Sequence, residues 1–274
     1  MRQVRRIFIT GASSGIGQAL ALQLAQDGHI LGLAARRHQK LEAVAAKVKE
    51  AGGKALIYPL DVCDRQAQFT AVQAFVKEVG GLDVAIANAG FGLTKPILET
   101  TSEEAHELFD VNVFGLLNTL QASAPYLQGG VFVGVSSVVA YALPTGYGVY
   151  SATKSAVSAL MTILRRETEG QFEVVLINPG ETQTEFWQVA EKRSGELLPG
   201  GSPVPFKTAE TVAAAIVKAI YKPQPSVFMS LSEKLLPLLR GAFPGVLERH
   251  FKQFDREMKQ KKTHKLTSLS HPQA

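Results

Sequence analysis

The sequence predicts a single α/β domain in which helices cover both faces of a doubly wound, central parallel sheet, followed by a C-terminal helical extension. Short apolar segments alternate with amphipathic segments from residue 4 to about residue 231. Strict alternation of strands and helices is typical of a parallel sheet that is buried on both faces. No shift in composition divides this part of the chain, so we assign residues 1–231 to one domain and residues 232–274 to the extension.

The first half of the chain contains apolar, often β-branched segments separated by segments with apolar residues at helical spacing. The strands are expected at 4–10, 30–35, 55–60 and 84–88. The helices are expected at 16–28, 37–51 and 64–79. Asp64 can cap the third helix, and glycine ends each of the three, which is typical of helix termini.

The second half continues the same pattern with one irregular stretch. Thr101 and Glu104 have the spacing of a capping box, so a long helix is expected to begin there. The helices are expected at about 101–126, 150–170 and 208–221. The strands are expected at 131–136, 174–178 and 227–231. Residues 181–206 are rich in glycine, proline and polar residues and are expected to be irregular.

Composition and charge exclude several classes of protein. The chain has 29 Lys and Arg residues and 24 Asp and Glu residues. Residues 231–274 contain nine of the basic and four of the acidic residues, so the rest of the chain contains 20 basic and 20 acidic residues. Because the body is neutral, it is not expected to bind nucleic acid. The six histidines show no metal-ligand spacing. The single cysteine, Cys63, cannot form an internal disulfide, and no apolar run could span a bilayer, so we expect a cytoplasmic protein.

A glycine-rich loop, TGASSGIG at residues 10–17, lies between the first strand and the first helix. A doubly wound sheet binds a dinucleotide at this junction, because glycines let the backbone approach the pyrophosphate and the helix N-terminus favours its charge. An ordinary strand-to-helix turn is the alternative. The residues expected to bind the cofactor here are Gly11, Ser13, Ser14, Gly15, Ile16 and Gly17.

The end of the second strand favours NADP(H) over NAD. An acidic residue at this point binds the ribose 2′-hydroxyl of NAD, whereas arginine binds the 2′-phosphate of NADP. The sequence reads Ala34-Ala35-Arg36-Arg37, without an acid. We expect Arg36 to hold the phosphate, with help from Arg37 and Ser13. The alternative is that both arginines are solvated residues at a helix start.

Tyr150 and Lys154 are four residues apart on an expected helix, and therefore on the same face of it. An ammonium group beside a phenol is expected to lower the pKa of the phenol, which makes it usable as an acid or base. Ser137, at the end of a buried strand, could hydrogen-bond the same substrate oxygen. A chance pair of surface residues is the alternative for Tyr150 and Lys154 alone.

Together these motifs resemble the classical short-chain dehydrogenase/reductase family, with its Rossmann-type fold, over about residues 4–230. The resemblance identifies Asn112, Ser137, Tyr150 and Lys154 with the family's catalytic residues, in which Asn112 supports a water next to Lys154. Tyr150 and Lys154 also contact the cofactor, Lys154 at the nicotinamide ribose. The further matching cofactor residues are Asp61, Val62, Asn88, Ala89, Gly90, Pro179, Gly180 and Thr184. Glu181 departs from the family pattern, in which apolar residues are more usual at this position.

The resemblance implies an NADP(H)-dependent carbonyl reductase or alcohol dehydrogenase with Tyr150 as the acid/base. It also implies a homodimer or homotetramer built through helices 102–126 and 150–169. In the family, residues equivalent to 181–206 shape the substrate pocket. The apolar residues that suggest a lipophilic substrate are Phe186, Trp187, Val189, Leu197, Leu198 and Phe206. The alternatives are a catalytically idle NADP(H)-binding regulator and an epimerase or dehydratase on the same fold.

The extension has apolar residues at helical spacing over residues 234–262, with a break near Pro244-Gly245 and a basic opposite face. Such a helix can lie on an anionic membrane surface. Packing of the helix on its own body or on a partner subunit is the preferred interpretation.

Overall fold

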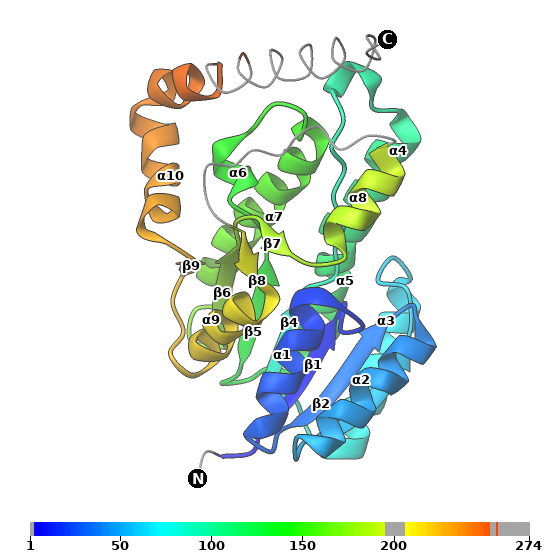
Figure 1. Ribbon diagram of the computed structural model, residues 1–274. Helices are drawn as coiled ribbons and strands as arrows, with labels where there is room; N and C mark the ends of the chain where they lie inside the picture. Colours follow the sequence, from blue (N-terminus) through cyan, green and yellow to red (C-terminus); the bar gives the residue numbers. More distant parts are fainter. Residues whose placement is uncertain (1–2, 195–205, 253–255, 257–274) are drawn as a thin grey trace, which may run out of the picture.

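The computed structural model describes residues 3–194, 206–252 and 256. A seven-stranded parallel sheet in the order β3-β2-β1-β4-β5-β6-β9 forms its centre (Figure 1). The strands are β1 (Arg6–Thr10), β2 (Ile30–Ala35), β3 (Lys54–Pro59), β4 (Val84–Ala87), β5 (Val131–Val135), β6 (Glu173–Asn178) and β9 (Ser226–Phe228). The predicted α/β fold with a doubly wound parallel sheet is confirmed.

Helices cover both faces of this sheet. The helices are α1 (Gly15–Gln26), α2 (His38–Glu50), α3 (Arg65–Val79), α4 (Ser102–Phe109), α5 (Gly115–Ser123), α6 (Val139–Ala142), α7 (Gly148–Glu167), α8 (Phe186–Ser194), α9 (Ala209–Tyr221) and α10 (Leu231–Ala242). Residues of α1, α2 and α9 share one buried cluster with Ile7 and Ile9. Residues of α3, α5 and α7 share the other with Phe8. Successive side chains of β1 therefore enter opposite cores, as expected for a strand buried on both faces.

The predicted long helix at 101–126 is helical throughout but is not one regular α-helix. It begins at the expected capping box, in which Thr101 accepts from the Glu104 amide and Glu104 accepts from the Thr101 amide. A π-helical turn, η2 (Asp110–Phe114), separates α4 from α5, and a 3-10 turn, η3 (Ala124–Tyr126), follows. A π-turn accommodates one extra residue within a helix and is frequent at functional sites.

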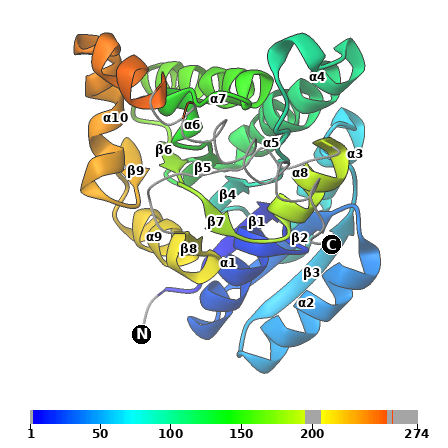
Figure 2. The same ribbon diagram turned by 45° about the horizontal axis from the view of Figure 1, so that its top comes forward.

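The irregular structure predicted for 181–206 is wrong for part of that segment. Residues Thr182–Gln183 form β7, which pairs with β8 (Lys207–Thr208), and the next residues form α8. Both views place α8 beyond the carboxyl edge of the central sheet, next to α4 (Figures 1 and 2). Residues 195–205, which include Leu197 and Leu198, lie outside the described residues, as do the side chains of Trp187 and Val189.

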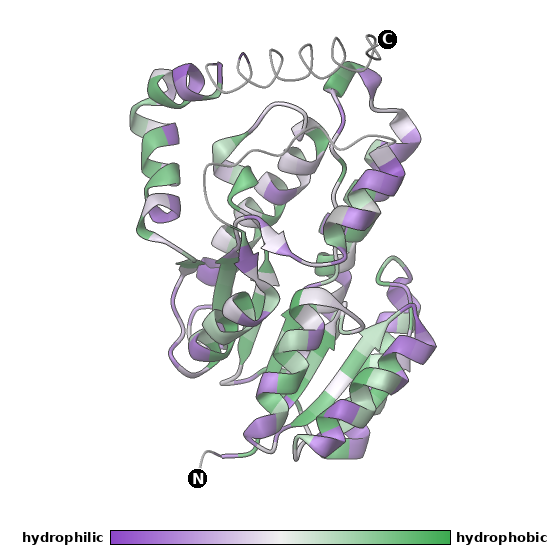
Figure 3. Cartoon of the chain, in the orientation of Figure 1, coloured by the Kyte–Doolittle hydropathy of each residue, from purple (hydrophilic) through white to green (hydrophobic). Residues whose placement is uncertain are grey.

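The extension is helical in α10 and again over residues 244–252, with the predicted break between them. Most of the predicted helix beyond 252 lies outside the described residues. α10 contacts α6 and β9, so part of it packs on its own body. Its outward residues Leu231, Leu235 and Leu238 are 81%, 52% and 59% exposed, and Figure 3 shows the mixture of apolar and polar residues along it. Within the described part of the chain, no helix is long and apolar enough to cross a membrane.

Candidate active site

The glycine-rich loop is held tightly against the end of β4. The Asn88 side-chain amide donates to the carbonyl oxygens of Thr10 and Gly11, at 3.1 and 3.3 Å. Gly11 has φ +68°, in the left-handed region that favours glycine, and a Cβ at Gly17 would lie 2.3 Å from the Gly11 carbonyl oxygen. There is therefore no room for a side chain at Gly11 or Gly17, and the tight turn at the N-terminus of α1 fits the binding of a dinucleotide pyrophosphate.

Arg37, and not Arg36, lies over this loop. The Arg37 Nη2 donates to Ser14 Oγ at 2.7 Å and to Ser13 Oγ at 3.2 Å. Arg36 lies next to Asp61, with Nη1 3.7 Å from Oδ2, and its side chain is mostly exposed. The sequence predicts Arg36 as the main phosphate ligand with help from Arg37, whereas in the structure Arg37 is the arginine that contacts the loop. The fold brings Arg37 together with the two serines, and Arg36 together with Asp61, one of the predicted cofactor residues.

Tyr150, Lys154 and Ser137 converge at the carboxyl edge of β5. The three residues are 7%, 4% and 9% exposed, and the Lys154 Nζ lies 5.9 Å from the centroid of the Tyr150 ring. Lys154 donates to the carbonyl oxygen of Val135, the last residue of β5, at 3.0 Å. Ser137 donates to the carbonyl oxygen of Pro179 at 3.2 Å. The spacing on α7 therefore places Tyr150 and Lys154 together, and Tyr150 hydrogen-bonds Ser137.

Asn112 is fixed in the π-turn by hydrogen bonds to backbone from another part of the chain. Its Oδ1 accepts from the Phe91 amide and its Nδ2 donates to the Phe91 carbonyl, both at 3.0 Å, while Nδ2 also donates to Thr153 Oγ1 at 3.1 Å. A Cβ at Gly90 would lie 2.9 Å from Asn112 Oδ1 and 3.4 Å from Lys154 Nζ. Gly90 thus lets the segment after β4 pass close to both side chains.

Burial dominates the acid–base properties of the pair. It raises the pKa of Tyr150 well above its ordinary value of 10, although a hydrogen bond with Ser137 opposes the rise. It lowers the pKa of Lys154 from 10.5 to about 8. The expected lowering of the Tyr150 pKa is therefore wrong for this structure, because loss of solvation outweighs the hydrogen bond with Ser137, and Lys154 donates to backbone instead. At neutral pH the phenol is protonated, which is the state of a proton donor.

The remaining predicted cofactor residues line the same edge. The Thr10 hydroxyl accepts from the Asn88 and Ala89 amides at 3.2 and 3.3 Å. A Cβ at Gly15 would lie 3.2 Å from Thr184 Cβ, so the two segments touch. A Cβ at Gly115 would lie 2.7 Å from Val62 Cγ2, so Val62 packs against α5. Ile16 is half-buried and packs against the cluster under α1.

Phe186, one of the apolar residues named from the sequence, lies at this edge together with Glu185 and Glu233, which the sequence did not single out. Phe186 lies with its ring 5.7 Å from that of Tyr150. Glu185 pairs with Arg37, with Oε2 2.9 Å from Nη1. Glu233, at the start of α10, is 3% exposed, and a Cβ at Gly180 would lie 2.5 Å from its Oε1. These contacts join segments far apart in the chain, so only the tertiary fold reveals them.

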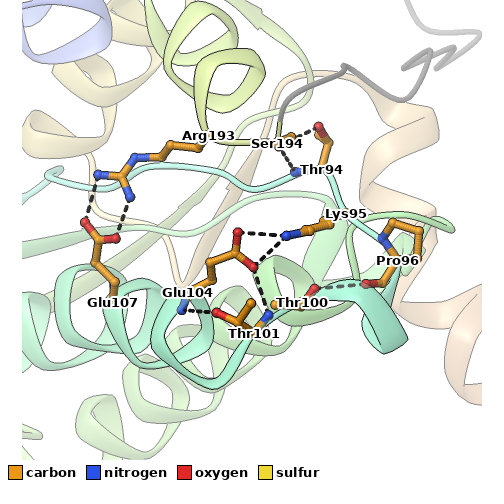
Figure 4. A network of polar contacts seen from close by, with 9 residues as sticks. All are labelled: Thr94, Lys95, Pro96, Thr100, Thr101, Glu104, Glu107, Arg193 and Ser194. Atoms are coloured by element: carbon orange, nitrogen blue, oxygen red, sulfur yellow. Dashed lines mark hydrogen bonds and ion pairs between the residues drawn. The ribbon is translucent and has the colours of Figure 1, made fainter.

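The far end of α8 is fixed to the body by polar contacts (Figure 4). Both terminal guanidinium nitrogens of Arg193 pair with the Glu107 carboxylate, at 2.5 and 2.8 Å. The Thr94 amide and hydroxyl lie 3.1 and 3.2 Å from Ser194 Oγ. α8 is therefore held between the glycine-rich loop at one end and α4 at the other. The described residues contain no cluster of His, Cys, Asp or Glu able to hold a metal ion.

The sequence model of the short chain dehydrogenases matches residues 5–195. The chain belongs to the classical short-chain dehydrogenase/reductase family. An uncharacterized oxidoreductase of Listeria monocytogenes is 34% identical over 228 residues, covering 80% of this short-chain dehydrogenase and 91% of that protein. The glycine betaine reductase of Emericella nidulans is 36% identical over 225 residues, which are 79% of this chain but 17% of that protein.

A solved structure supports the same assignment. The alcohol dehydrogenase from the archaeon Thermococcus sibiricus, complexed with 5-hydroxy-NADP, is 30% identical and has a TM-score of 0.72. The similarity covers 82% of this short-chain dehydrogenase and 96% of the archaeal chain. The chain is thus an oxidoreductase of a family that uses nicotinamide cofactors and small-molecule substrates.

Proposed function

We propose that this short-chain dehydrogenase is an NADP(H)-dependent oxidoreductase that interconverts a carbonyl compound and a secondary alcohol, with Tyr150 as the acid/base. The convergence of Tyr150, Lys154 and Ser137 at the carboxyl edge of β5 carries the proposal. Because the Tyr150 phenol carries its proton at neutral pH and hydrogen-bonds Ser137, it can donate that proton to a substrate oxygen bound beside both residues.

Each residue of the site has a distinct role in this proposal. When bound, the nicotinamide supplies or accepts the hydride. Tyr150 donates the proton to the substrate oxygen or removes it, and Ser137 holds that oxygen by a hydrogen bond. Lys154 binds the nicotinamide ribose. Asn112 supports a water beside Lys154.

Exchange of Tyr150 for phenylalanine tests the assignment. Tyr150→Phe removes only the hydroxyl, so we expect turnover of carbonyl substrates to fall by at least about a hundredfold, in line with the loss of general acid catalysis. NADPH binding should persist. Tyr126→Phe, at an exposed position, is the matched control and should keep full activity. Near-normal turnover in Tyr150→Phe would refute the role.

We propose NADP(H) as the cofactor because the end of β2 offers arginine and no acid. Arg37 and the Ser13 hydroxyl are close enough to share one phosphate group, and Arg36 lies nearby. The archaeal relative complexed with an NADP derivative is consistent with this choice. Comparison of KM for NADPH and NADH tests it, and a strong preference for NADH would contradict it.

The substrate pocket is proposed to be lipophilic. Leu93, Leu108, Tyr147 and Tyr150 form a small buried cluster against which Phe186 packs, so apolar side chains pack around the Tyr150 ring. A panel of carbonyl compounds of increasing chain length, followed by the loss of NADPH absorbance, tests this. Equal turnover of small polar and long apolar carbonyls would argue against a lipophilic pocket.

A catalytically idle NADP(H)-binding regulator is the alternative. It is disfavoured because an idle site needs neither Tyr150 nor Lys154. Tight NADPH binding without consumption of NADPH by any carbonyl of the panel would favour it. An epimerase or dehydratase would instead convert its substrate without net change of the cofactor.

We propose that two or four copies associate through α5 and α7. Phe114, just before α5, and Leu160 and Ile163 on α7 are exposed, and contiguous exposed apolar surface marks interfaces. The outward face of α10 is proposed to pack on a partner subunit rather than a membrane. Sedimentation with anionic liposomes, comparing the full chain with one truncated at 232, tests this, and lipid binding by the full chain alone would contradict it. The cytoplasmic location stays a prediction.

A further inference from the structure

The carboxylate of Glu185 is bound where the proposed cofactor needs positive charge. Glu185 Oε2 lies 2.9 Å from Arg37 Nη1, and Oε1 lies 2.6 Å from Lys40 Nζ. The second terminal nitrogen of the same guanidinium is bound to Ser13 and Ser14 of the glycine-rich loop. Arg37, Lys40 and the two serines thus form a small anion-binding site. The Glu185 carboxylate already occupies the side of this site formed by Arg37 and Lys40.

The charge of Glu185 is matched to this site. Hydrogen bonds from Lys40 and Arg37 lower the pKa of Glu185 below its ordinary value, so the carboxylate is ionised at neutral pH. A carboxylate between an arginine and a lysine resembles a phosphate in charge and in hydrogen bonding. A phosphate can therefore replace it with little change in the cations.

We propose that Glu185 competes with the 2′-phosphate of NADP(H) for Arg37 and Lys40, and so sets how strongly the chain distinguishes NADP(H) from NAD(H). This inference rests on the proposed preference for NADP(H). NAD(H) has a hydroxyl at this position and cannot displace the carboxylate. Only the phosphorylated dinucleotide separates Glu185 from its two partners.

The competition also connects the cofactor to the substrate side of the site. Glu185 immediately precedes α8, and the next residue, Phe186, packs against the Tyr150 ring. Displacement of Glu185 frees the beginning of α8, while Arg193 and Ser194 keep its other end attached to Glu107 and Thr94. The choice of dinucleotide is thereby transmitted to the wall of the proposed substrate pocket.

Measurement of dissociation constants for NADPH and NADH, without substrate, tests the competition. Glu185→Gln keeps the size of the side chain and removes its charge. Because exposed ion pairs are weak, we expect NADPH to bind about fivefold tighter and NADH to change by less than about twofold. Glu191→Gln removes a charge from an exposed residue of α8 and should leave both constants unchanged.

A second comparison identifies the partner of Glu185. In an Arg37→Ala/Lys40→Ala background, Glu185→Gln should no longer tighten NADPH binding, because the cations for which it competes are gone. An unchanged NADPH constant in Glu185→Gln, an equal gain for NADH, or an equal gain in Glu191→Gln would overturn the proposal. A gain that persists without Arg37 and Lys40 would also overturn it.

The same data separate this inference from the cofactor assignment. The ratio of the two constants in the unmodified chain tests the preference for NADP(H), and the variants test the competition. Equal constants in the unmodified chain together with selective tightening in Glu185→Gln would reject the preference and support the competition. Absence of binding of both dinucleotides would reject both.

Discussion

Replacement of Lys154 by methionine is expected to change how the stability of the protein depends on pH. Lys154 is 4% exposed, and burial lowers its pKa from 10.5 to about 8. Below pH 8 the folded protein carries a buried ammonium, which is more favourable in the solvated, unfolded chain. As pH rises from 8 to 10.5, the folded state has lost this proton and the unfolded state has not, so folding becomes more favourable.

The size of the effect follows from the two pKa values. Each pH unit corresponds to about 1.4 kcal/mol, so the buried charge disfavours folding by about 3 kcal/mol at pH 7 and by less than about 1 kcal/mol at pH 10. Lys154→Met lacks this titration. It also leaves the Val135 carbonyl without the lysine donor, which costs about 1 kcal/mol or more, but equally at both pH values.

Urea unfolding of both proteins at pH 7 and pH 10, without cofactor, measures the difference. We expect the stability of Lys154→Met relative to the unmodified protein to fall by about 2.5 kcal/mol between the two pH values. The variant should have no reductase activity at either pH. If the free energy of unfolding changed equally with pH in the two proteins, burial of the Lys154 ammonium would not destabilise the fold by the expected amount, and this outcome would refute the argument from burial.

Three further exchanges test other parts of the structure. Gly17→Ala should weaken NADPH binding more than tenfold in a titration, because its Cβ would lie 2.3 Å from the Gly11 carbonyl oxygen; unchanged binding would contradict the close approach. Met161→Ala should lower the free energy of unfolding by about 2–5 kcal/mol, since Met161 is fully buried, and a loss below about 1 kcal/mol would argue against this packing. Burial raises the pKa of Asp83, but hydrogen bonds from Arg6 outweigh burial and lower the pKa below its ordinary value. The ionised Asp83 therefore stabilises the fold above its unfolded pKa of about 3.9, and this stabilisation is lost as pH falls through the lower folded value. Asp83→Asn should therefore unfold about 1–3 kcal/mol more easily at pH 7 but equally in stronger acid, and a loss that does not depend on pH would contradict the ion pair.

The strands and the order of the fold could be predicted because their signals are local. Each strand of the central sheet is a short apolar run, and β1 shows why, since Ile7 and Phe8 enter different cores. The capping box at Thr101 was equally readable, because both of its partners lie within one helical turn. Spacing on one helix likewise predicted that Tyr150 and Lys154 would lie together.

The features that the sequence did not predict depend on contacts between distant segments. α8 is fixed by Glu185 to Arg37 and by Arg193 to Glu107, and neither pair is visible in the periodicity of residues 181–206. Arg36 and Arg37 are neighbours in a basic dipeptide, and only the direction of the chain after β2 decides which one reaches the serines. The pKa of Tyr150 depended on burial, which the neighbouring lysine in the sequence could not reveal.

The π-turn at Asp110–Phe114 determines the direction in which the Asn112 side chain points relative to the residues of α5 that follow it. One residue advances an α-helix by about 100°, so the extra residue rotates everything after it relative to α4. Deletion of a single residue here would turn Asn112 away from Phe91, or would rotate α5 so that Gly115 no longer lies against Val62. Because of the π-turn, the number of residues in this helix, and not only their identity, determines whether the Asn112 amide lies near Lys154.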